Sequence, residues 1–232
     1  MATIHIVVQS KSVGKTIVAS LLTQCLRDEC GKSVLCLDTD EICFSLSNYK
    51  ELQAVQVPVS GLAAYCRTLP QDSAHVVIDT STASFMPFCS LLQSVLLQQL
   101  EDAGHIVRMH TVVAGGPDAL PTFNGFRSLV SNFRAMQFTV WPNPYYGPLV
   151  LEDVPFEESR VYREHNTQIH ALVRLPDRRQ LAQEDFQDML TRHITFKEAL
   201  QEGAGSSIAQ KIRLKNLWQH MIEQVNCAAL CG

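Results

Sequence analysis

The chain has 232 residues, which is enough to bury one sizeable core, and its net charge of −4 and pI near 6 give no electrostatic reason to expect a nucleic-acid footprint. No apolar run can span a bilayer, because Gln98, Gln99 and Glu101 interrupt the longest one, and no secretory signal is visible. We expect one cytoplasmic domain over residues 1–232. The eight cysteines form no C-x-x-C pair, which favours free thiols over disulfides or a metal site.

The first element is a β-branched apolar run at residues 3–8, followed by a polar loop and by Gly14, Lys15 and Thr16. A periodic apolar segment then predicts a helix that ends near Gly31. Strand, loop and helix in this order are typical of a phosphate-binding loop, in which Lys15 contacts the β- and γ-phosphates and Thr16 holds Mg²⁺. The residues expected to bind the nucleotide here are Ser12, Val13, Gly14, Lys15, Thr16 and Ile17. The alternative is an ordinary strand and helix, since Gln9 replaces the first glycine of the general pattern.

Two further apolar runs end in acids. Residues 33–37 lead into Asp38, Thr39 and Asp40, and residues 75–78 lead into Asp79 as in a Walker B strand. Carboxylates at the carboxyl ends of strands lie where α/β sheets bind ligands, although a solvated turn also uses Asp and Thr. We expect Thr16, Asp38 and Asp79 to serve one Mg²⁺.

The middle of the chain continues the alternation of helix and strand. The pattern predicts a helix over 85–103, a strand over 106–113, a helix over 118–133 and a strand over 138–141. A proline-rich turn at 142–148 follows, in which Asn143 either reads a base edge or caps the turn. This order predicts an α/β fold of three layers, with a mostly parallel sheet and helices on both faces.

The last third predicts a helix over 157–164, a strand over 168–175 and helices over 178–191 and 196–202. A C-terminal helix at about 206–226 has an apolar stripe and basic residues largely elsewhere. Such a stripe can bind a membrane or a partner helix, but docking on its own domain is favoured. The stripe consists of Ile208, Ile212, Leu217, Trp218, Met221, Ile222 and Val225.

Several motifs together resemble the deviant Walker A ATPases of the ParA/MinD group, and within it the TraL-type nucleotide-binding proteins of plasmid conjugation systems. The motifs are residues 9–16, the acid-terminated strands at Asp38, Asp40 and Asp79, residues 104–105 and 110–113, the aromatic Pro–Asn–Pro segment at 141–148, and residues 194–200. The match extends over nearly the whole chain, and the Pro–Asn–Pro segment is its most specific part.

The resemblance implies ATP with Mg²⁺ and slow hydrolysis coupled to homodimer formation. It assigns phosphate and metal roles to Lys15 and Thr16, a Mg²⁺ role to Asp38 and Asp79, and the attacking water to Asp40. It also places Asn143, with Pro144 beside it, at the adenine. The group's loop begins with a lysine that reaches the partner subunit's phosphates, but position 10 here is serine and Lys11 lies one residue too close. Glycines of that loop are also replaced, by Gln9, Ser10 and Ser12.

The leading hypothesis is therefore a nucleotide-dependent switch that contacts protein components of a transfer apparatus, with Lys11, Lys15 and Asp40 as its catalytic candidates. One alternative is a non-hydrolysing scaffold that kept the fold, which the lost glycines motivate. Another is a small-molecule kinase of the same fold, with arginines as phosphate clamps or, more simply, as solvated surface. Those arginines are Arg160, Arg163, Arg174, Arg178 and Arg179.

Overall fold

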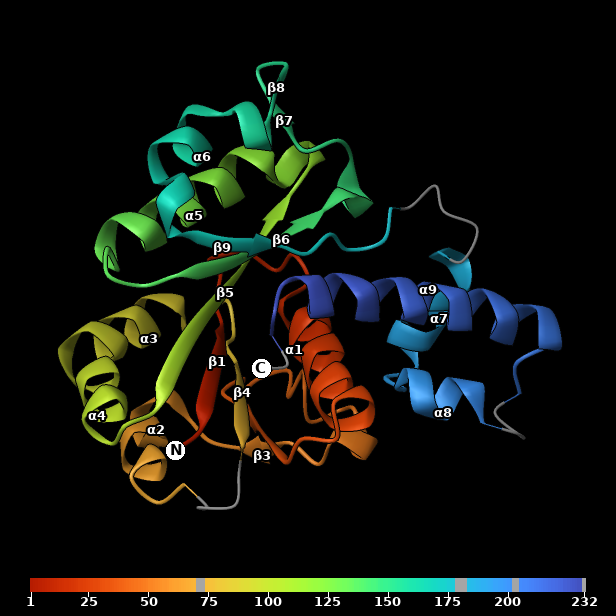
Figure 1. Ribbon diagram of the computed structural model, residues 1–232, viewed down its shortest axis with the longest axis horizontal. Coiled ribbons are helices and arrows are strands. Elements are labelled where there is room, and N and C mark those ends of the chain that lie inside the picture. Colours follow the sequence, from red (N-terminus) through yellow and green to blue (C-terminus); the bar gives the residue numbers. More distant parts are fainter. Residues whose placement is uncertain (70–73, 178–182, 202–204, 231–232) are drawn as a thin grey trace.

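A seven-stranded parallel sheet forms the centre of the computed structural model, which describes residues 1–69, 74–177, 183–201 and 205–230 (Figure 1). The strands lie in the order β3-β2-β4-β1-β5-β6-β9, and every neighbouring pair is parallel. Their bounds are β1 Thr3–Val7, β2 Val34–Asp38, β3 Val55–Gln56, β4 His75–Asp79, β5 Ile106–Ala114, β6 Phe138–Asn143 and β9 Ile169–Leu172. This confirms the predicted α/β fold.

Helices cover both faces of the sheet, so that the strands are buried on two sides and read as continuous apolar runs (Figure 1). In β1, for example, Ile4 and Ile6 belong to one core and Val7 to the other. One core includes α1 (Lys15–Gln24), α7 (Gln183–Thr191), α8 (Phe196–Leu200) and α9 (Ile208–Cys227). The other includes α2 (Val59–Cys66), α3 (Phe85–Leu91), α4 (Leu97–Asp102), α5 (Ala119–Asn132) and α6 (Arg160–His165).

The C-terminal helix α9 docks on the chain's own core, as the sequence favoured. Leu214, Leu217, Trp218, Met221 and Val225 are buried there. The indole of Trp218 stacks on Phe196 at 4.7 Å between ring centroids and donates a hydrogen bond to Glu29. Only the first turns of the stripe, at Ile208 and Ile212, remain exposed. No helix in the described ranges combines the length and apolar character needed to cross a membrane.

Three buried histidines form a hydrogen-bonded chain beneath α1, across the middle of the sheet. Trp141 Nε1 donates to His110 Nδ1 at 3.1 Å, so neutral His110 carries its proton on Nε2. His110 therefore donates to His5 Nδ1, and His5 in turn donates to His75 Nδ1, both at 3.0 Å. Burial, together with neighbouring histidines and Arg108, lowers the pKa of His5 well below its usual value. The four side chains thus satisfy each other only when all three rings are neutral.

The structure also contains elements that the sequence pattern did not predict. Helix α2, strand β3 and the hairpin of β7 (Val150–Leu151) and β8 (Val154–Pro155) fall in stretches left unassigned. Each of these strands has two residues, too few to show periodicity. Helix α6 begins at Arg160 instead of residue 157, because the Ser159 hydroxyl accepts a hydrogen bond from the Tyr162 N–H and caps it there.

Other expected boundaries shift by a few residues. Strand β9 ends at Leu172 instead of residue 175. Residues 178–182 and 202 of two expected helices lie outside the described residues. Among the described residues, six cysteines are free thiols, namely Cys25, Cys36, Cys43, Cys66, Cys89 and Cys227. Cys30 is disulfide-bonded, so the expectation that every cysteine is free was wrong for this residue.

Candidate functional site

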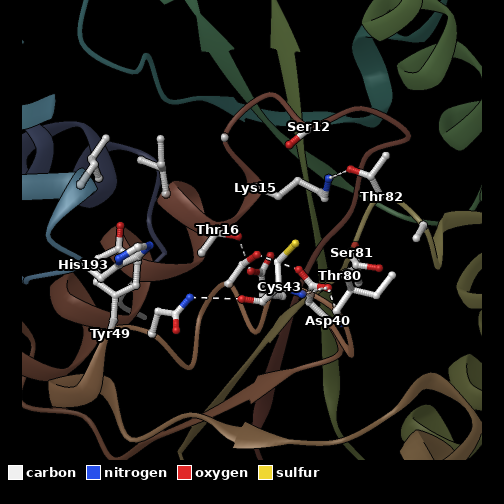
Figure 2. A pocket seen from close by; sticks show the side chains of 18 of the residues that line it. Ser12, Lys15, Thr16, Asp40, Cys43, Tyr49, Thr80, Ser81, Thr82 and His193 are labelled. Atoms are coloured by element: carbon white, nitrogen blue, oxygen red, sulfur yellow. Dashed lines mark hydrogen bonds between the residues drawn. The ribbon is translucent and has the colours of Figure 1, made fainter.

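A cavity lies at the carboxyl ends of β1, β2 and β4 (Figure 2). Its volume is about 540 Å³. The phosphate-loop segment, the segment after β2 and the segment after β4 each contribute lining residues. The predicted residues among them are Ser12, Gly14, Lys15, Thr16, Ile17, Asp40 and Asp79. The predicted residues that do not line it are Lys11, Val13, Asp38, Asn143 and Pro144.

The loop from Gln9 to Thr16 is free of the backbone strain that the missing glycines suggested. Within it only Gly14 has a positive φ, of 105°, and it forms the N-cap of α1. Ser10 and Ser12 stand at positions where a Cβ is tolerated. The replacement of the family's glycines therefore carries no dihedral cost in this loop.

Gln9 fills the space that a glycine would leave at the start of the loop. Its side chain is fully buried, and Nε2 donates to the Val112 carbonyl at 2.8 Å and to Thr111 Oγ1 at 3.3 Å. Its Oε1 accepts hydrogen bonds from the N–H of Ser10 at 2.7 Å and from the Ser10 hydroxyl at 3.0 Å. Both ends of the amide are thus satisfied, and its Nε2 end attaches the loop to β5.

Lys15 points across the cavity to the segment after β4 (Figure 2). Its Nζ donates to the Lys11 carbonyl and to Thr82 Oγ1, each at 2.8 Å. Burial lowers the pKa of Lys15, and the carboxylates of Asp79 and Asp40 oppose that effect. The Lys11 side chain is exposed, and only its carbonyl takes part in the site.

Thr16 and Asp79 form the metal-binding candidate. The Thr16 hydroxyl donates to Asp79 Oδ2 at 2.6 Å. The other oxygen, Asp79 Oδ1, is buried and has no hydrogen-bond partner in the described structure. Burial raises the pKa of Asp79, and the Thr16 hydrogen bond opposes the rise. A buried carboxylate oxygen without a partner is costly, and a hard divalent cation would satisfy it. The donor set therefore fits Mg²⁺.

Asp38 and Asp40 are largely engaged with the backbone after β2. Asp38 is fully buried, and its two oxygens accept from the N–H groups of Asp40 and Ser47 at 2.9 Å and from Gln56 at 3.0 Å. Asp40 accepts from the N–H groups of Ile42 and Cys43 and from the Ser45 hydroxyl. Burial would raise the pKa of Asp40, but these hydrogen bonds outweigh it and hold the pKa below its usual value. Of the two, only Asp40 faces the cavity, so the structure does not bring Asp38 to the Mg²⁺ site at which it was expected, because protein groups already occupy both of its oxygens.

Asn143 lies behind the loop instead of over the cavity. Its Nδ2 donates to the Val13 carbonyl at 2.8 Å, and its Oδ1 accepts from the Tyr145 N–H at 3.1 Å. The amide therefore holds the loop and caps the turn that begins at Pro144. Asn143 also borders a second cavity, of about 70 Å³.

Several lining residues escaped the sequence interpretation. Thr82 follows the end of β4 closely, a position that could have drawn attention to it, and its hydroxyl accepts a hydrogen bond from Lys15. Tyr49 and His193, whose rings meet edge to face at 5.5 Å, carry no motif that marks them (Figure 2). Of the arginines considered as phosphate clamps, Arg174 pairs with Glu157 and Arg160 with Glu164, and neither they nor Arg163 line the cavity. Arg178 and Arg179 lie outside the described residues.

Comparison with known proteins gives close relatives over the full length. Two proteins of Escherichia coli, each named Protein TraL, are 32% identical over 242 residues, covering 99% of this chain and 100% of the relative. No protein-family model matches.

Solved structures with the same fold include the septum site-determining protein MinD complexed with Mg-ADP from Pyrococcus horikoshii. It has a TM-score of 0.52 and 15% identity, covering 99% of this chain and 98% of that one. The MinD cell division protein of Aquifex aeolicus has a TM-score of 0.52 and 11% identity, with coverage of 96% and 97%. At these identities the likeness shows a shared fold.

Proposed function

This chain belongs to the TraL family, and from that premise we propose that it is an ATP-binding switch protein of a conjugal transfer system that hydrolyses ATP slowly. The observation that carries the proposal is the arrangement of Lys15, Thr16 and the unpartnered oxygen of Asp79 around one cavity. A P-loop lysine, a hydroxyl and a Walker B carboxylate together supply the contacts that a Mg²⁺-nucleotide needs.

Each side chain has a defined part in this proposal. Lys15 leaves its bonds to Thr82 and the Lys11 carbonyl and neutralises the β- and γ-phosphates. Thr16 and Asp79 hold Mg²⁺, which when bound neutralises further phosphate charge. Asp38 supports the site from behind by ordering the segment after β2, and Asp40 orients the attacking water from the rim.

Slow turnover follows from the position of Lys11. Its side chain is exposed and outside the cavity, so within one subunit nothing in the structure directs its charge at the phosphates. We propose that two ATP-bound copies pair, and that Lys11 is too poorly placed to accelerate hydrolysis in its partner. A positive charge supplied by a partner subunit raises the rate of hydrolysis about 10³–10⁵-fold where it operates. Components of the transfer apparatus then recognise whether the protein has ATP bound.

The decisive experiment is calorimetric titration of Mg²⁺-ATP into the parent, Lys15→Ala and the control Lys215→Ala, whose side chain is exposed on α9. We expect Lys15→Ala to weaken binding at least about tenfold, since a charge-assisted contact contributes roughly 1.5–3 kcal/mol. The control should match the parent. Equal ATP affinity in all three proteins, each folded by circular dichroism, would show that the loop does not bind phosphate.

A further inference from the structure

The small cavity behind the loop has a different chemistry from the phosphate end. It adjoins the main cavity, because Gly14, Ile17 and Tyr146 line both. The segment after β9 and helix α7 complete its walls with Leu175, Pro176, Phe186 and Gln187, beside Asn143 and Tyr145. Its described lining mixes apolar side chains with amides and tyrosines and includes no cationic side chain, which suits a flat heterocycle better than another phosphate.

Gln187 is the amide in this cavity that a ligand can use. Both ends of the Asn143 amide are already bonded, to Val13 and Tyr145. Gln187 is half-buried, and within the described ranges its side-chain amide makes no hydrogen bond, while its backbone carbonyl accepts one from the Thr191 hydroxyl. Its side chain therefore keeps both N–H donors and the carbonyl acceptor available.

We propose that Gln187 of α7 reads the edge of the nucleobase and makes the site select adenine. The inference rests on the proposed function, because it needs a nucleotide whose phosphates lie on the loop. An amide donates to N7 and accepts from the N6 amino group of adenine, whereas the same edge of guanine shows two acceptors, which a single amide cannot match. Asn143 then acts as the floor of the base site and Gln187 as its reader.

Helix α7 forms one wall of the proposed base site through Phe186 and Gln187. The cavity has a volume of about 70 Å³ and adjoins the larger one at Gly14, Ile17 and Tyr146. The helix is held by the contact of Asp185 with Arg213 of α9, at 2.6 and 3.2 Å, and by Phe186 stacked on Phe196 at 5.8 Å. Reading of the base is thereby connected to the packing of α9.

The test compares binding of Mg²⁺ complexes of ATP, GTP and inorganic tripolyphosphate to the parent, Gln187→Ala, Gln187→Met and the control Gln219→Ala. Gln219 is exposed on α9 and lines neither cavity. We expect the parent to prefer ATP over GTP. Both Gln187 variants should bind ATP about tenfold more weakly, the low end of what a bidentate base contact provides, with GTP and tripolyphosphate little changed.

The tripolyphosphate arm shows whether each variant still has a folded loop, and Gln187→Met retains the length of the side chain. An unchanged ratio of ATP to GTP affinity in both Gln187 variants would overturn this inference alone, as would a parent that prefers GTP. A parent that binds neither ATP nor tripolyphosphate would overturn the proposed function and this inference with it.

Discussion

Removing His110 from the chain of buried histidines should flatten the dependence of stability on pH. The rings of His5, His75 and His110 are satisfied only as neutral groups, and burial, with Arg108 and His170 nearby, lowers the pKa of His110 to about 3. An unfolded histidine has a pKa of about 6.5. The unfolded state therefore binds more protons below pH 6.5, and stability present above that pH is lost as the pH falls towards 3.

For His110 alone, the loss between pH 7.5 and pH 5.0 is about 2 kcal/mol, at 1.36 kcal/mol per unit below 6.5. That is a large part of the roughly 5–15 kcal/mol that holds a typical domain folded. In His110→Gln the amide can still accept from Trp141 but cannot titrate. We expect this variant to be less stable at pH 7.5 because it loses a packed ring, and to lose about 2 kcal/mol less than the parent on acidification.

The assay is urea unfolding followed by far-UV circular dichroism at several values between pH 7.5 and 5.0. Because the comparison uses the slope with pH, a lower starting stability of the variant does not obscure it. The control His220→Gln removes an exposed imidazole on α9 and should retain the parent's slope. A slope for His110→Gln equal to that of the parent would refute the idea that the buried ring stays neutral.

Two further predictions concern the phosphate end of the cavity. Asp79→Asn should make ATP affinity insensitive to Mg²⁺, because the unpartnered Oδ1 is the oxygen offered to the ion. Titrations of ATP with Mg²⁺ and with EDTA measure this. A full Mg²⁺ response in the variant would contradict it. Lys11→Ala should leave ATP affinity nearly unchanged and lower phosphate release only slightly, since the side chain is exposed. Two results would instead show that Lys11 completes a shared site. One is phosphate release by the parent that rises with the square of protein concentration, and the other is phosphate release that collapses in Lys11→Ala.

The sequence predicted the sheet well because each main strand is buried on both faces. Because helices cover both faces of the sheet, the strands that end at Asp38 and Asp79 consist mostly of apolar residues. Because the two strands are parallel neighbours, their carboxyl ends lie side by side. Lys15 and Thr16 follow the loop between β1 and α1, and Asp79 ends the neighbouring strand β4, so the sequence could predict that they lie close together; Thr16 and Asp79 are hydrogen-bonded in the structure.

What the sequence could not show depends on partners far along the chain. In the sequence Gln9 is only a missing glycine of the loop. Its hydrogen bonds join it to β5, about a hundred residues further along the chain. Asn143 was expected to read a base edge, and the sequence alone could not show that the Val13 carbonyl and the Tyr145 N–H already occupy both ends of its amide. Helix α7 had no visible link to the loop, since its approach is decided by packing against α8 and α9.

The contact between Gln9 and Gly125 of helix α5 links the amino-acid substitutions that the two positions can accept. Gly125 faces the Gln9 amide, and a Cβ at position 125 would lie 2.1 Å from Gln9 Oε1 and 3.0 Å from Ser10 Oγ. Gly125→Ala therefore requires the Gln9 amide to shift, whereas Gln9→Gly alone opens a void and removes hydrogen bonds to β5. The effect of a substitution at either position therefore depends on the residue at the other.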